Sequence, residues 1–407
     1  MANYIKNIPK SISKLHSSIY PVYAKGSYIY TGDHNKYLDL TSGIGALSTG
    51  HNHPYIKNAV SAQLDKYVHI PQQVFQSHPI QTELTNKILE TVPGTDLDSI
   101  FYVSSGSEAT DNAIKIARKY TGKSNIISMN GGFHGRTIAA LSVTSSNLNC
   151  RKGLTPLMSN VFFCDEFAHE SLHKLFEYQT SPDDTAAILL ESVQGEGGIK
   201  SIEKGFVQHI KEVCEYNNIM LIADEVQCGS MRTGVWWDII GKDVVPDIMT
   251  FGKGIASGYP LAGVISKSEI MDNLGKGYFG GTYGGNGICS AAASATIDIL
   301  NNPEIVDNVV VMGKYIKTSL ENEPLIKEIR QHGLMIGIEF LFNDYNPELS
   351  LKLVTRLRDK GILVLVSGNK SQYIRLLPPL NIDQEDIDVF LHTFKKILAQ
   401  ESGIFCR

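Results

Sequence analysis

The segment Thr250-Phe251-Gly252-Lys253-Gly254 places a lysine between two glycines, directly after a short apolar run. A lysine that is buried and closely surrounded by backbone has a lowered pKa, which suits a nucleophile that forms a Schiff base. A solvated loop lysine is the ordinary alternative. The residue types make Lys253 a candidate for bond formation with an aldehyde.

A carboxylate, like Lys253, follows an apolar run, because residues 219–223 are apolar and Asp224 comes next. A carboxylate at the end of a buried strand is costly unless a partner compensates its charge. A protonated ring nitrogen would be a fitting partner, and a structural salt bridge is the alternative.

The third feature is the run Ser105-Gly106-Ser107-Glu108, where an apolar stretch gives way to a helical pattern. A helix start offers free N–H groups, a positive dipole end and hydroxyl donors, which suit a phosphate. An ordinary N-cap by Ser105 or Ser107 is the alternative. A lysine for an aldehyde, an aspartate for a pyridinium nitrogen and a helix start for a phosphate together fit pyridoxal phosphate.

These residues lie where predicted strands end. Short apolar runs alternate with helical patterns in the middle of the chain, which is typical of an α/β fold with a mostly parallel sheet covered by helices. The predicted strands are 99–105, 186–191, 219–226, 247–252 and 261–266, and the helices among them are 107–120 and 203–217.

Both ends of the chain have a different pattern. A hairpin is predicted over 27–40, and after residue 298 predicted helices (304–322, 348–360, 384–401) alternate with predicted strands (335–341, 362–366, 373–377). We therefore expect residues 1–44 and 298–407 to build a smaller α+β domain, and residues 45–297 to form a large cofactor-binding domain.

The composition narrows the possible partners. The net charge is −5 and the pI is about 6.2, so no basic surplus indicates nucleic acid or an anionic membrane. Charged residues make up 19% of the chain, below the usual quarter, which suggests that some surface is buried against a second chain. The six cysteines show no Cys-x-x-Cys spacing, so free thiols in the cytoplasm are expected.

No membrane or leader segment is expected. The uncharged run 277–297 contains several glycines and polar residues, which a lipid-facing helix would not carry. The first residues lack both the apolar core of a signal peptide and the arginine-rich pattern of a transit peptide.

One short motif favours a different chemistry. Residues 169–173 read His-Glu-Ser-Leu-His, the spacing of a zinc protease, with His169 and His173 one helical turn apart. A solvated helix face explains the pair more simply, and no third ligand motif follows. A zinc hydrolase stays an alternative, as does a non-catalytic binding protein.

The chain resembles the class III pyridoxal-phosphate aminotransferases, the 4-aminobutyrate, acetylornithine and ornithine type, from about residue 20 to residue 400. This resemblance implies a fold-type I enzyme, normally a homodimer with its active sites at the subunit interface. The matching blocks are YLDLTSGIGALSTGHNHP (37–54), SSGSEATDNAIKIAR (104–118), GGFHGRT (131–137), ESVQGEGG (191–198), LIADEVQCGSMRTG (221–234), PDIMTFGKGIASGYPLAG (246–263), GGTYGGN (280–286) and IRLLPPL (374–380).

The resemblance implies a role for each residue around the cofactor ring. Lys253 would bond to the cofactor aldehyde and later move the proton between substrate carbon and cofactor, and Asp224 would keep the ring nitrogen protonated. Phe133 and Val226 would sandwich the ring, and Gln227 would reach the 3′-oxygen.

The same resemblance assigns the phosphate end of the cofactor. Gly106 and Ser107 would bind the phosphate, joined by Thr282 from the other subunit of the homodimer. His134 and Glu191 complete the implied cofactor-binding set, and no metal site is implied.

Four residues bear on substrate choice. Arg136 resembles the arginine that holds the distal carboxylate of an ω-amino acid, and Arg375 the one that binds the α-carboxylate of glutamate or 2-oxoglutarate. Glu196 resembles the switch that covers Arg375 while the ω-amino substrate is bound. Ile44 stands where ornithine aminotransferases carry a tyrosine, and an aliphatic wall suits a short substrate without an α-amino group.

We therefore expect an enzyme that moves the amino group of an ω-amino acid, with 4-aminobutyrate favoured, to 2-oxoglutarate by a ping-pong mechanism. Acetylornithine or another ω-amine is the nearest alternative donor. A class III racemase or epimerase is a further alternative, which would need no keto-acid acceptor. Ser230-Met231 and Gly287 depart from the family pattern near the rim of the expected pocket.

Overall fold

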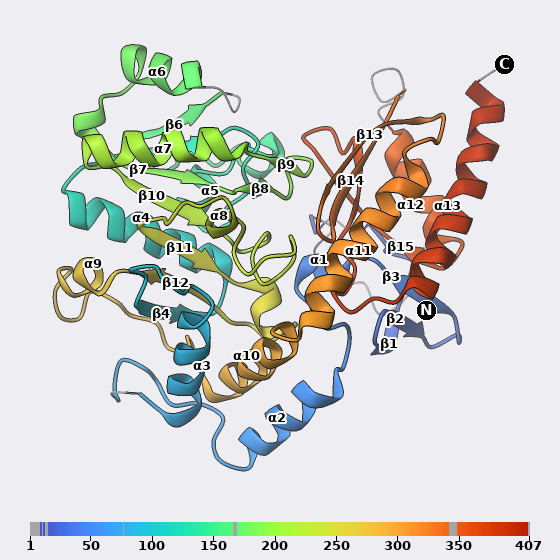
Figure 1. The fold of residues 1–407 in the computed structure, drawn as a ribbon, viewed down its shortest axis with the longest axis horizontal. Coiled ribbons are helices and arrows are strands. Elements are labelled where there is room, and N and C mark those ends of the chain that lie inside the picture. The colour runs from blue at the N-terminus through green and yellow to red at the C-terminus, as the bar shows by residue number, and fades with distance from the viewer. Residues whose placement is uncertain are drawn as a thin grey trace.

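The structure is a computed structural model that describes residues 9, 11–12, 15–75, 77–165, 169–341 and 348–405, with side chains to residue 401. Its elements form two groups that lie side by side (Figure 1). The larger group surrounds a central sheet, and the smaller one contains the elements from both ends of the chain.

The central sheet has seven strands, and β12 is the one that runs against its neighbours. The expected α/β fold with a mostly parallel sheet is confirmed. In order across the sheet the strands are β4 (Ser99–Val103), β12 (Ala262–Ser266), β11 (Ile248–Phe251), β10 (Met220–Asp224), β7 (Thr185–Leu190), β5 (Asn125–Met129) and β6 (Val161–Cys164).

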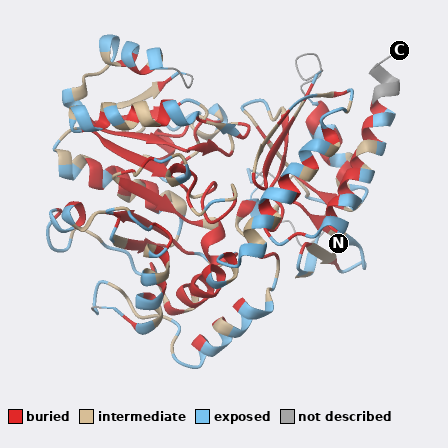
Figure 2. Cartoon of the chain, in the orientation of Figure 1, coloured by how far each residue is buried: buried red, intermediate tan, exposed pale blue. Residues whose placement is uncertain are grey.

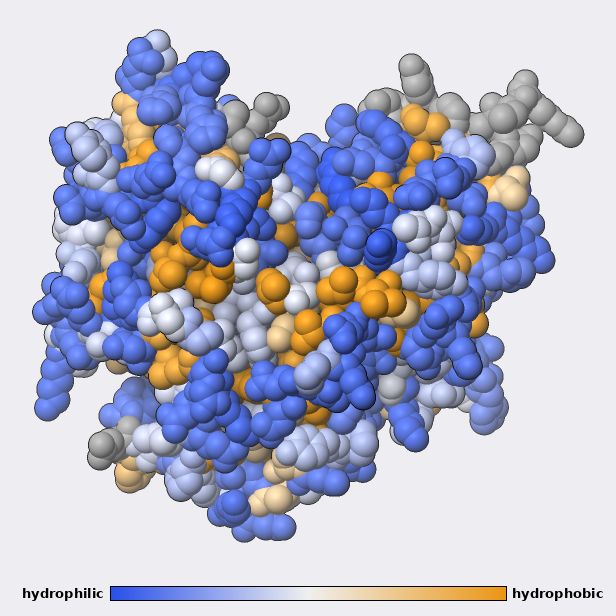
Figure 3. Space-filling view, in the orientation of Figure 1, coloured by the Kyte–Doolittle hydropathy of each residue, from blue (hydrophilic) through white to orange (hydrophobic). Residues whose placement is uncertain are grey.

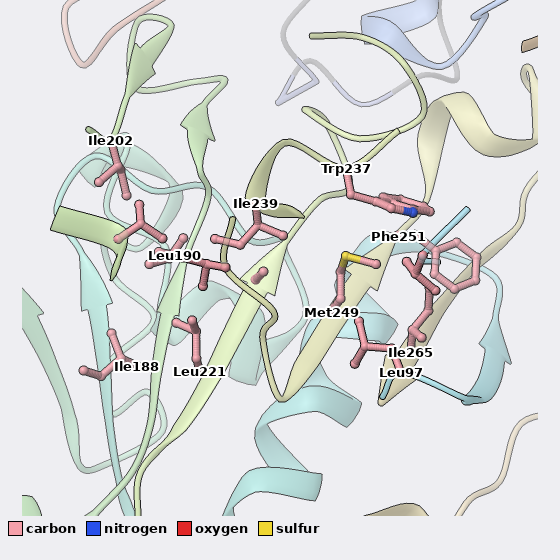
Figure 4. Close-up of a cluster of buried hydrophobic side chains, with 14 of the residues drawn as sticks. Leu97, Ile188, Leu190, Ile202, Leu221, Trp237, Ile239, Met249, Phe251 and Ile265 are labelled. Atoms are coloured by element: carbon pink, nitrogen blue, oxygen red, sulfur yellow. The ribbon is translucent and has the colours of Figure 1, made fainter. Parts of the chain in front are cut away.

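The strands are apolar on both faces because helices cover both (Figure 2). Ile222 of β10 packs with residues of α4 (Gly106–Thr121), whereas its neighbour Leu221 packs on the opposite face with residues of α7 (Lys204–Asn217). Figure 4 shows the second of these clusters, in which Leu221, Ile188 and Met249 come from adjacent strands. This rigid layer fixes the positions at which the strands end.

The smaller group contains two four-stranded sheets. The first joins both ends of the chain, because Leu38 of β3 pairs in parallel with Ile362 of β15. Its strands are β1 (Pro21–Lys25), β2 (Tyr28–Thr31), β3 (Lys36–Asp39) and β15 (Ile362–Leu363); those of the second are β13 (Ile326–His332), β14 (Met335–Phe340), β17 (Tyr373–Leu376) and β16 (Leu365–Ser367). The helices are α11 (Pro303–Leu320), α12 (Leu349–Arg358) and α13 (Gln384–Phe405).

The predicted strand 362–366 is wrong in one respect, because it is two strands rather than one. β15 pairs with β3, whereas β16 pairs with β17 in the other sheet. The chain changes sheets at Val364, which is fully buried, so the apolar run continues through the break. The predicted domain boundaries after residues 44 and 297 stay a proposal.

The remaining elements connect these layers. They are α1 (Ser42–Gly45), α2 (Pro54–Leu64), α3 (Pro79–Leu89), α5 (Ile138–Ser142), α6 (His169–Tyr178), α8 (Asp238–Gly241), α9 (Ser268–Asp272), α10 (Gly287–Leu300), the strand pair β8 (Val193–Gln194) and β9 (Lys200–Ser201), and 3-10 turns at Leu148–Cys150, Pro182–Asp184 and Lys253–Ala256. Within the described ranges no helix is both long and apolar enough to cross a membrane. The face shown in Figure 3 is largely hydrophilic, with hydrophobic patches near its middle.

Candidate active site

A pocket of about 150 Å³ opens where the central strands end. It brings together nine of the ten predicted cofactor-binding residues, which come from segments far apart in the sequence. The lining consists of Ser105, Gly106, Ser107, Phe133, His134, Gly135, Glu191, Asp224, Val226, Gln227 and Lys253. The tenth residue, Thr282, is exposed and does not line this pocket.

The phosphate end of the pocket is the start of α4. Ser105 caps the helix: its Oγ accepts from the Glu108 N–H at 3.3 Å, and the Glu108 carboxylate accepts from the Ser105 N–H at 2.9 Å. The N–H groups of Gly106 and Ser107 precede the first intrahelical hydrogen bond and are available to an anion. The cap is therefore at Ser105, and it leaves the predicted anion site free to bind a phosphate.

Two glycines line the pocket at positions where a side chain would collide with its neighbours. A Cβ on Gly106 would lie 2.8 Å from Cγ1 of Val226, and one on Gly135 would collide with the Ser107 hydroxyl. The Ser107 hydroxyl also accepts the Arg136 N–H at 3.1 Å. The space in front of the helix is thus kept open by the absence of side chains.

Asp224 lies at the carboxyl end of β10 and is 3% exposed. Its Oδ2 lies 2.7 Å from Nδ1 of His134, and its Oδ1 accepts from the Val226 N–H and the Thr250 hydroxyl, each at 3.1 Å. Burial alone would lower the pKa of His134, but Asp224, helped by Glu191, outweighs that effect and raises it. The protonated imidazole is therefore favoured beside the Asp224 carboxylate.

Glu191 is the third ionisable side chain of this cluster. Its oxygens accept from the N–H groups of Phe133 at 2.9 Å and Gly195 at 3.1 Å. Burial, with the nearby charge of Asp224, raises the pKa of Glu191 to about 7, although His134 acts in the opposite direction. At neutral pH the carboxyl group is therefore partly protonated.

Lys253 follows β11 and begins a 3-10 turn in a left-handed backbone conformation, with φ of 45°. Removal from solvent lowers the pKa of its amine, although Glu196, Asp224 and Glu191 act against that shift. A neutral amine is the form that attacks an aldehyde.

Arg375 and Glu196 form an ion pair beside the pocket. Arg375, on β17, is 3% exposed, and its Nη1 lies 2.6 Å from Oε1 of Glu196, whose side chain is 29% exposed. The same nitrogen donates to Gln227 of the pocket at 3.4 Å. The buried member of the pair is thus held in place while the other reaches solvent.

The other two predicted substrate residues lie outside the pocket lining. Arg136 is exposed, its guanidinium lies 5.6 Å from the centre of the Phe133 ring, and it forms no ion pair with any residue that the structure describes. Ile44 is 51% exposed and lies in a run of left-handed residues, 42–45, whose Gly45 packs against Leu377.

Two residues that contact the site were not predicted from the sequence. Thr250 donates to Asp224, and Thr144 accepts the His134 N–H at 2.9 Å. The parallel register of β10 and β11 pairs Asp224 with Thr250, so the strand assignment contained that signal. No sequence pattern indicates that Thr144 contacts His134.

The zinc-type motif lies on α6, away from the pocket. The rings of His169 and His173 lie 4.4 and 5.8 Å from that of His209 on α7. Over the ranges described, no group of three or more His, Cys, Asp or Glu side chains is arranged to hold a metal ion. The geometry therefore gives the zinc hydrolase alternative no support.

The pocket residues fit pyridoxal 5′-phosphate. The same cavity is lined by an amine with a lowered pKa, a buried carboxylate paired with the His134 imidazole, and a helix start kept open by Gly106 and Gly135. These are the groups needed for the aldehyde, the ring nitrogen and the phosphate.

Comparisons with known proteins agree with this geometry. A family model, aminotransferase class-III, matches residues 11–398. The chain is 36% identical over 398 residues to the 4-aminobutyrate aminotransferase GabT of Escherichia coli, with 93% of each chain covered. It is 35% identical over 403 residues to the acetylornithine aminotransferase of Methanocaldococcus jannaschii, covering 95% of this chain and 96% of that one.

Solved structures give the same result. A transaminase from the marine bacterium Virgibacillus superposes with a TM-score of 0.91 at 27% identity, covering 97% of each chain. An amine transaminase from an uncultivated Pseudomonas species, solved with pyridoxal phosphate bound, has a TM-score of 0.87 at 25% identity and covers 96% of this chain and 98% of that one. The chain belongs to the class III aminotransferases, which are pyridoxal-phosphate-dependent enzymes.

Proposed function

We propose that this aminotransferase takes the amino group from an ω-amino acid, with 4-aminobutyrate as the preferred donor, and passes it to 2-oxoglutarate in a ping-pong mechanism. The products are an aldehyde and glutamate. The observation that carries this proposal is the Glu196–Arg375 pair beside the pocket. A guanidinium that is covered by a carboxylate for one substrate and uncovered for the next serves an enzyme whose two substrates differ in their α-carboxylate.

The donor end is argued from Arg136 and Ile44. The Arg136 guanidinium has no ionic partner among the described residues and stands beside the Phe133 ring, where it would bind the distal carboxylate of the donor. Ile44 would supply an apolar wall. An apolar wall leaves an α-amino group unpaired and so favours a donor that lacks one.

Pyridoxal phosphate, when bound, supplies the electron sink that lets the C–H bond beside the substrate nitrogen ionise. In our proposal the Nζ of Lys253 carries the proton, and Asp224 keeps the ring nitrogen protonated with help from His134 and Glu191. The remaining roles are binding ones: Phe133 and Val226 pack on the ring faces, Gln227 contacts the 3′-oxygen, and Gly106 and Ser107 hold the phosphate.

We also propose a homodimer in the cytoplasm, in which Thr282 completes the phosphate site of the neighbouring subunit. Thr282 lies on an exposed loop whose Gly281 carbonyl accepts from the Gln73 side chain. Val74, Phe75 and Tyr283 beside it are 70, 57 and 65% exposed. Apolar side chains gathered at such a loop favour burial against a second chain.

Acetylornithine is the nearest alternative donor. The relatives named for it are as similar to this chain as those named for 4-aminobutyrate, and a 5-aminovalerate aminotransferase of Pseudomonas putida is 34% identical over 417 residues, with 98% of each chain covered. A racemase differs in needing no 2-oxo acid. Donor and acceptor dependence therefore separate the three possibilities.

The test is a pair of half-reactions on the loaded enzyme. The absorption of the aldehyde form of the cofactor is expected to disappear with 4-aminobutyrate and to return with 2-oxoglutarate, with one glutamate formed per site. Lys253→Ala is the control and is expected to show neither change. If acetylornithine acts and 4-aminobutyrate does not, the donor assignment is wrong; if an α-amino acid turns over without any 2-oxo acid, the aminotransfer assignment is wrong.

A further inference from the structure

Glu196 is carried by a short hairpin. Val193 pairs with Ser201 and Gln194 with Lys200, so residues 195–199 form the turn that holds Glu196 opposite Arg375. Three of those five turn residues are glycine. Because glycine leaves the backbone with many accessible conformations, the position of this turn depends on what holds it from outside.

Two hydrogen bonds to backbone carbonyls of the turn hold it against the smaller group of elements. The Gly368 N–H donates to the Glu196 carbonyl at 2.7 Å, and Nη1 of Arg330 donates to the Gly198 carbonyl at 2.9 Å. Neither contact involves the Glu196 side chain. Both can therefore persist whether or not that side chain is paired with Arg375.

Arg330 is itself contacted by three further residues, among them Glu339, whose Oε2 lies 3.9 Å from its Nη2. Its guanidinium lies 4.7 Å from the centre of the Tyr373 ring, and its Nη2 lies 2.7 Å from Oε2 of Glu328. Tyr373 also packs on Gly198, where a Cβ would lie 2.6 Å from the Tyr373 ring. We name Arg330, Tyr373 and Gly198 the turn clamp.

The turn clamp is connected to the Glu196–Arg375 pair and separate from the pocket. Tyr373 and Arg375 are alternate residues of β17, so their side chains project from the same face of the sheet. Arg330 and Tyr373 line a different cleft, of about 900 Å³, and neither lines the cofactor pocket. An effect of Arg330 on substrate choice would therefore act through the turn.

We propose that Arg330 is a positioning residue: by fixing the Gly198 carbonyl it keeps Glu196 in register with Arg375, and so sets the preference between ω-amino donors and substrates with an α-carboxylate. This inference rests on the proposed function. An α-carboxylate binds only while Arg375 is uncovered, so its apparent affinity falls with the fraction of time that Glu196 occupies the arginine. Loosening the turn increases the uncovered fraction.

The test compares glutamate with 4-aminobutyrate as donors to the loaded Arg330→Gln enzyme. The ratio of kcat/KM for glutamate to that for 4-aminobutyrate is expected to rise about fivefold, through a lower KM for glutamate at unchanged kcat. Arg330→Lys keeps the charge and is expected to shift the ratio less. Arg358→Gln is the matched control, since Arg358 forms its ion pair with Asp359 at the end of α12, away from the turn.

Binding of glutarate, which has neither an amino nor a keto group, gives a readout without turnover. Calorimetry is expected to show about fivefold tighter binding to Arg330→Gln than to the wild type. In a Glu196→Gln background the Arg330 substitution is expected to change neither quantity. A shift that persists in that background, or an equal change for both donors, overturns the role of Arg330. If Glu196→Gln alone leaves the donor ratio unchanged, the role of the Glu196–Arg375 pair in the proposed function is what fails.

Discussion

The Nδ1 atom of His134 lies 2.7 Å from Oδ2 of Asp224, and the two side chains are 0 and 4% exposed. Each of the two buried side chains thus has a hydrogen-bonding partner in the other. Burial, with the nearby charge of Asp224, raises the pKa of Glu191, the neighbouring acid, to about 7. The site therefore contains one buried acid paired with an imidazole and a second buried acid, Glu191, that titrates near neutrality.

The titration of Glu191 is expected to appear in the stability of the enzyme. A carboxyl group whose pKa rises from 4.5 to about 7 on folding binds more protons in the folded state, so stability falls as the pH increases between those values. Glu191→Gln removes this loss. We expect the free energy of unfolding of the variant, relative to the wild type, to increase by roughly 3 kcal/mol from pH 4.5 to pH 8.

Denaturant unfolding at a series of pH values measures that difference. Glu90→Gln, at an exposed position, controls for the removal of a negative charge in general. A difference between Glu191→Gln and the wild type that stays constant with pH would contradict the burial argument.

Glu196→Gln is expected to change donor preference. The neutral amide binds Arg375 less strongly than a carboxylate does, so glutamate reaches the arginine more easily. We expect kcat/KM for glutamate relative to 4-aminobutyrate to rise about tenfold. Stopped-flow measurement of the two donor half-reactions provides the ratio, and a fall in both rates by the same factor would indicate a role outside substrate choice.

Gly106→Ala is expected to weaken cofactor binding. Its Cβ would lie 2.8 Å from Val226, and the displacement that relieves this contact moves Val226 toward the expected ring position. We expect the dissociation constant of pyridoxal phosphate to rise about tenfold or more. Titration of the apoenzyme measures it. Gly205→Ala, which has no atom within 4 Å of its Cβ, should leave that constant unchanged.

Ser230→Gly is expected to stabilise the protein. Ser230 and Met231 are buried and have φ values of 55° and 65°, a backbone conformation that costs residues with a Cβ. We expect a gain of about 0.5–1 kcal/mol in the free energy of unfolding. Ala399→Gly, in the exposed face of α13, is the control and is expected to lose about 1 kcal/mol. A loss in both variants would mean that the Ser230 side chain itself stabilises the protein.

Lys253 and Asp224 could be predicted from the sequence because each follows an apolar run, and those runs are buried strands. Local pattern also indicated a cap of α4 at Ser105 or Ser107, and the structure has it at Ser105. It did not reveal the change of sheets at Val364, because an apolar run has the same pattern whether its residues pair in one sheet or two.

Contacts between distant segments could not be predicted either, because they leave no local pattern in the sequence. Ile44 has φ of 65°, which a β-branched residue avoids, and packing around its turn imposes that conformation. The contact of Arg330 with Gly198 joins residues that no sequence period relates. Tertiary structure alone brings such pairs together.

The parallel pairing of β3 with β15 has a consequence for how the chain is made. The hairpin of β2 and β3 leaves the ribosome before β15, the strand that completes its sheet and follows more than 300 residues later. Its free edge stays open to pairing with other chains during that interval. Slowing translation between β3 and β15 should therefore increase aggregation of the enzyme and its need for chaperones in the cell.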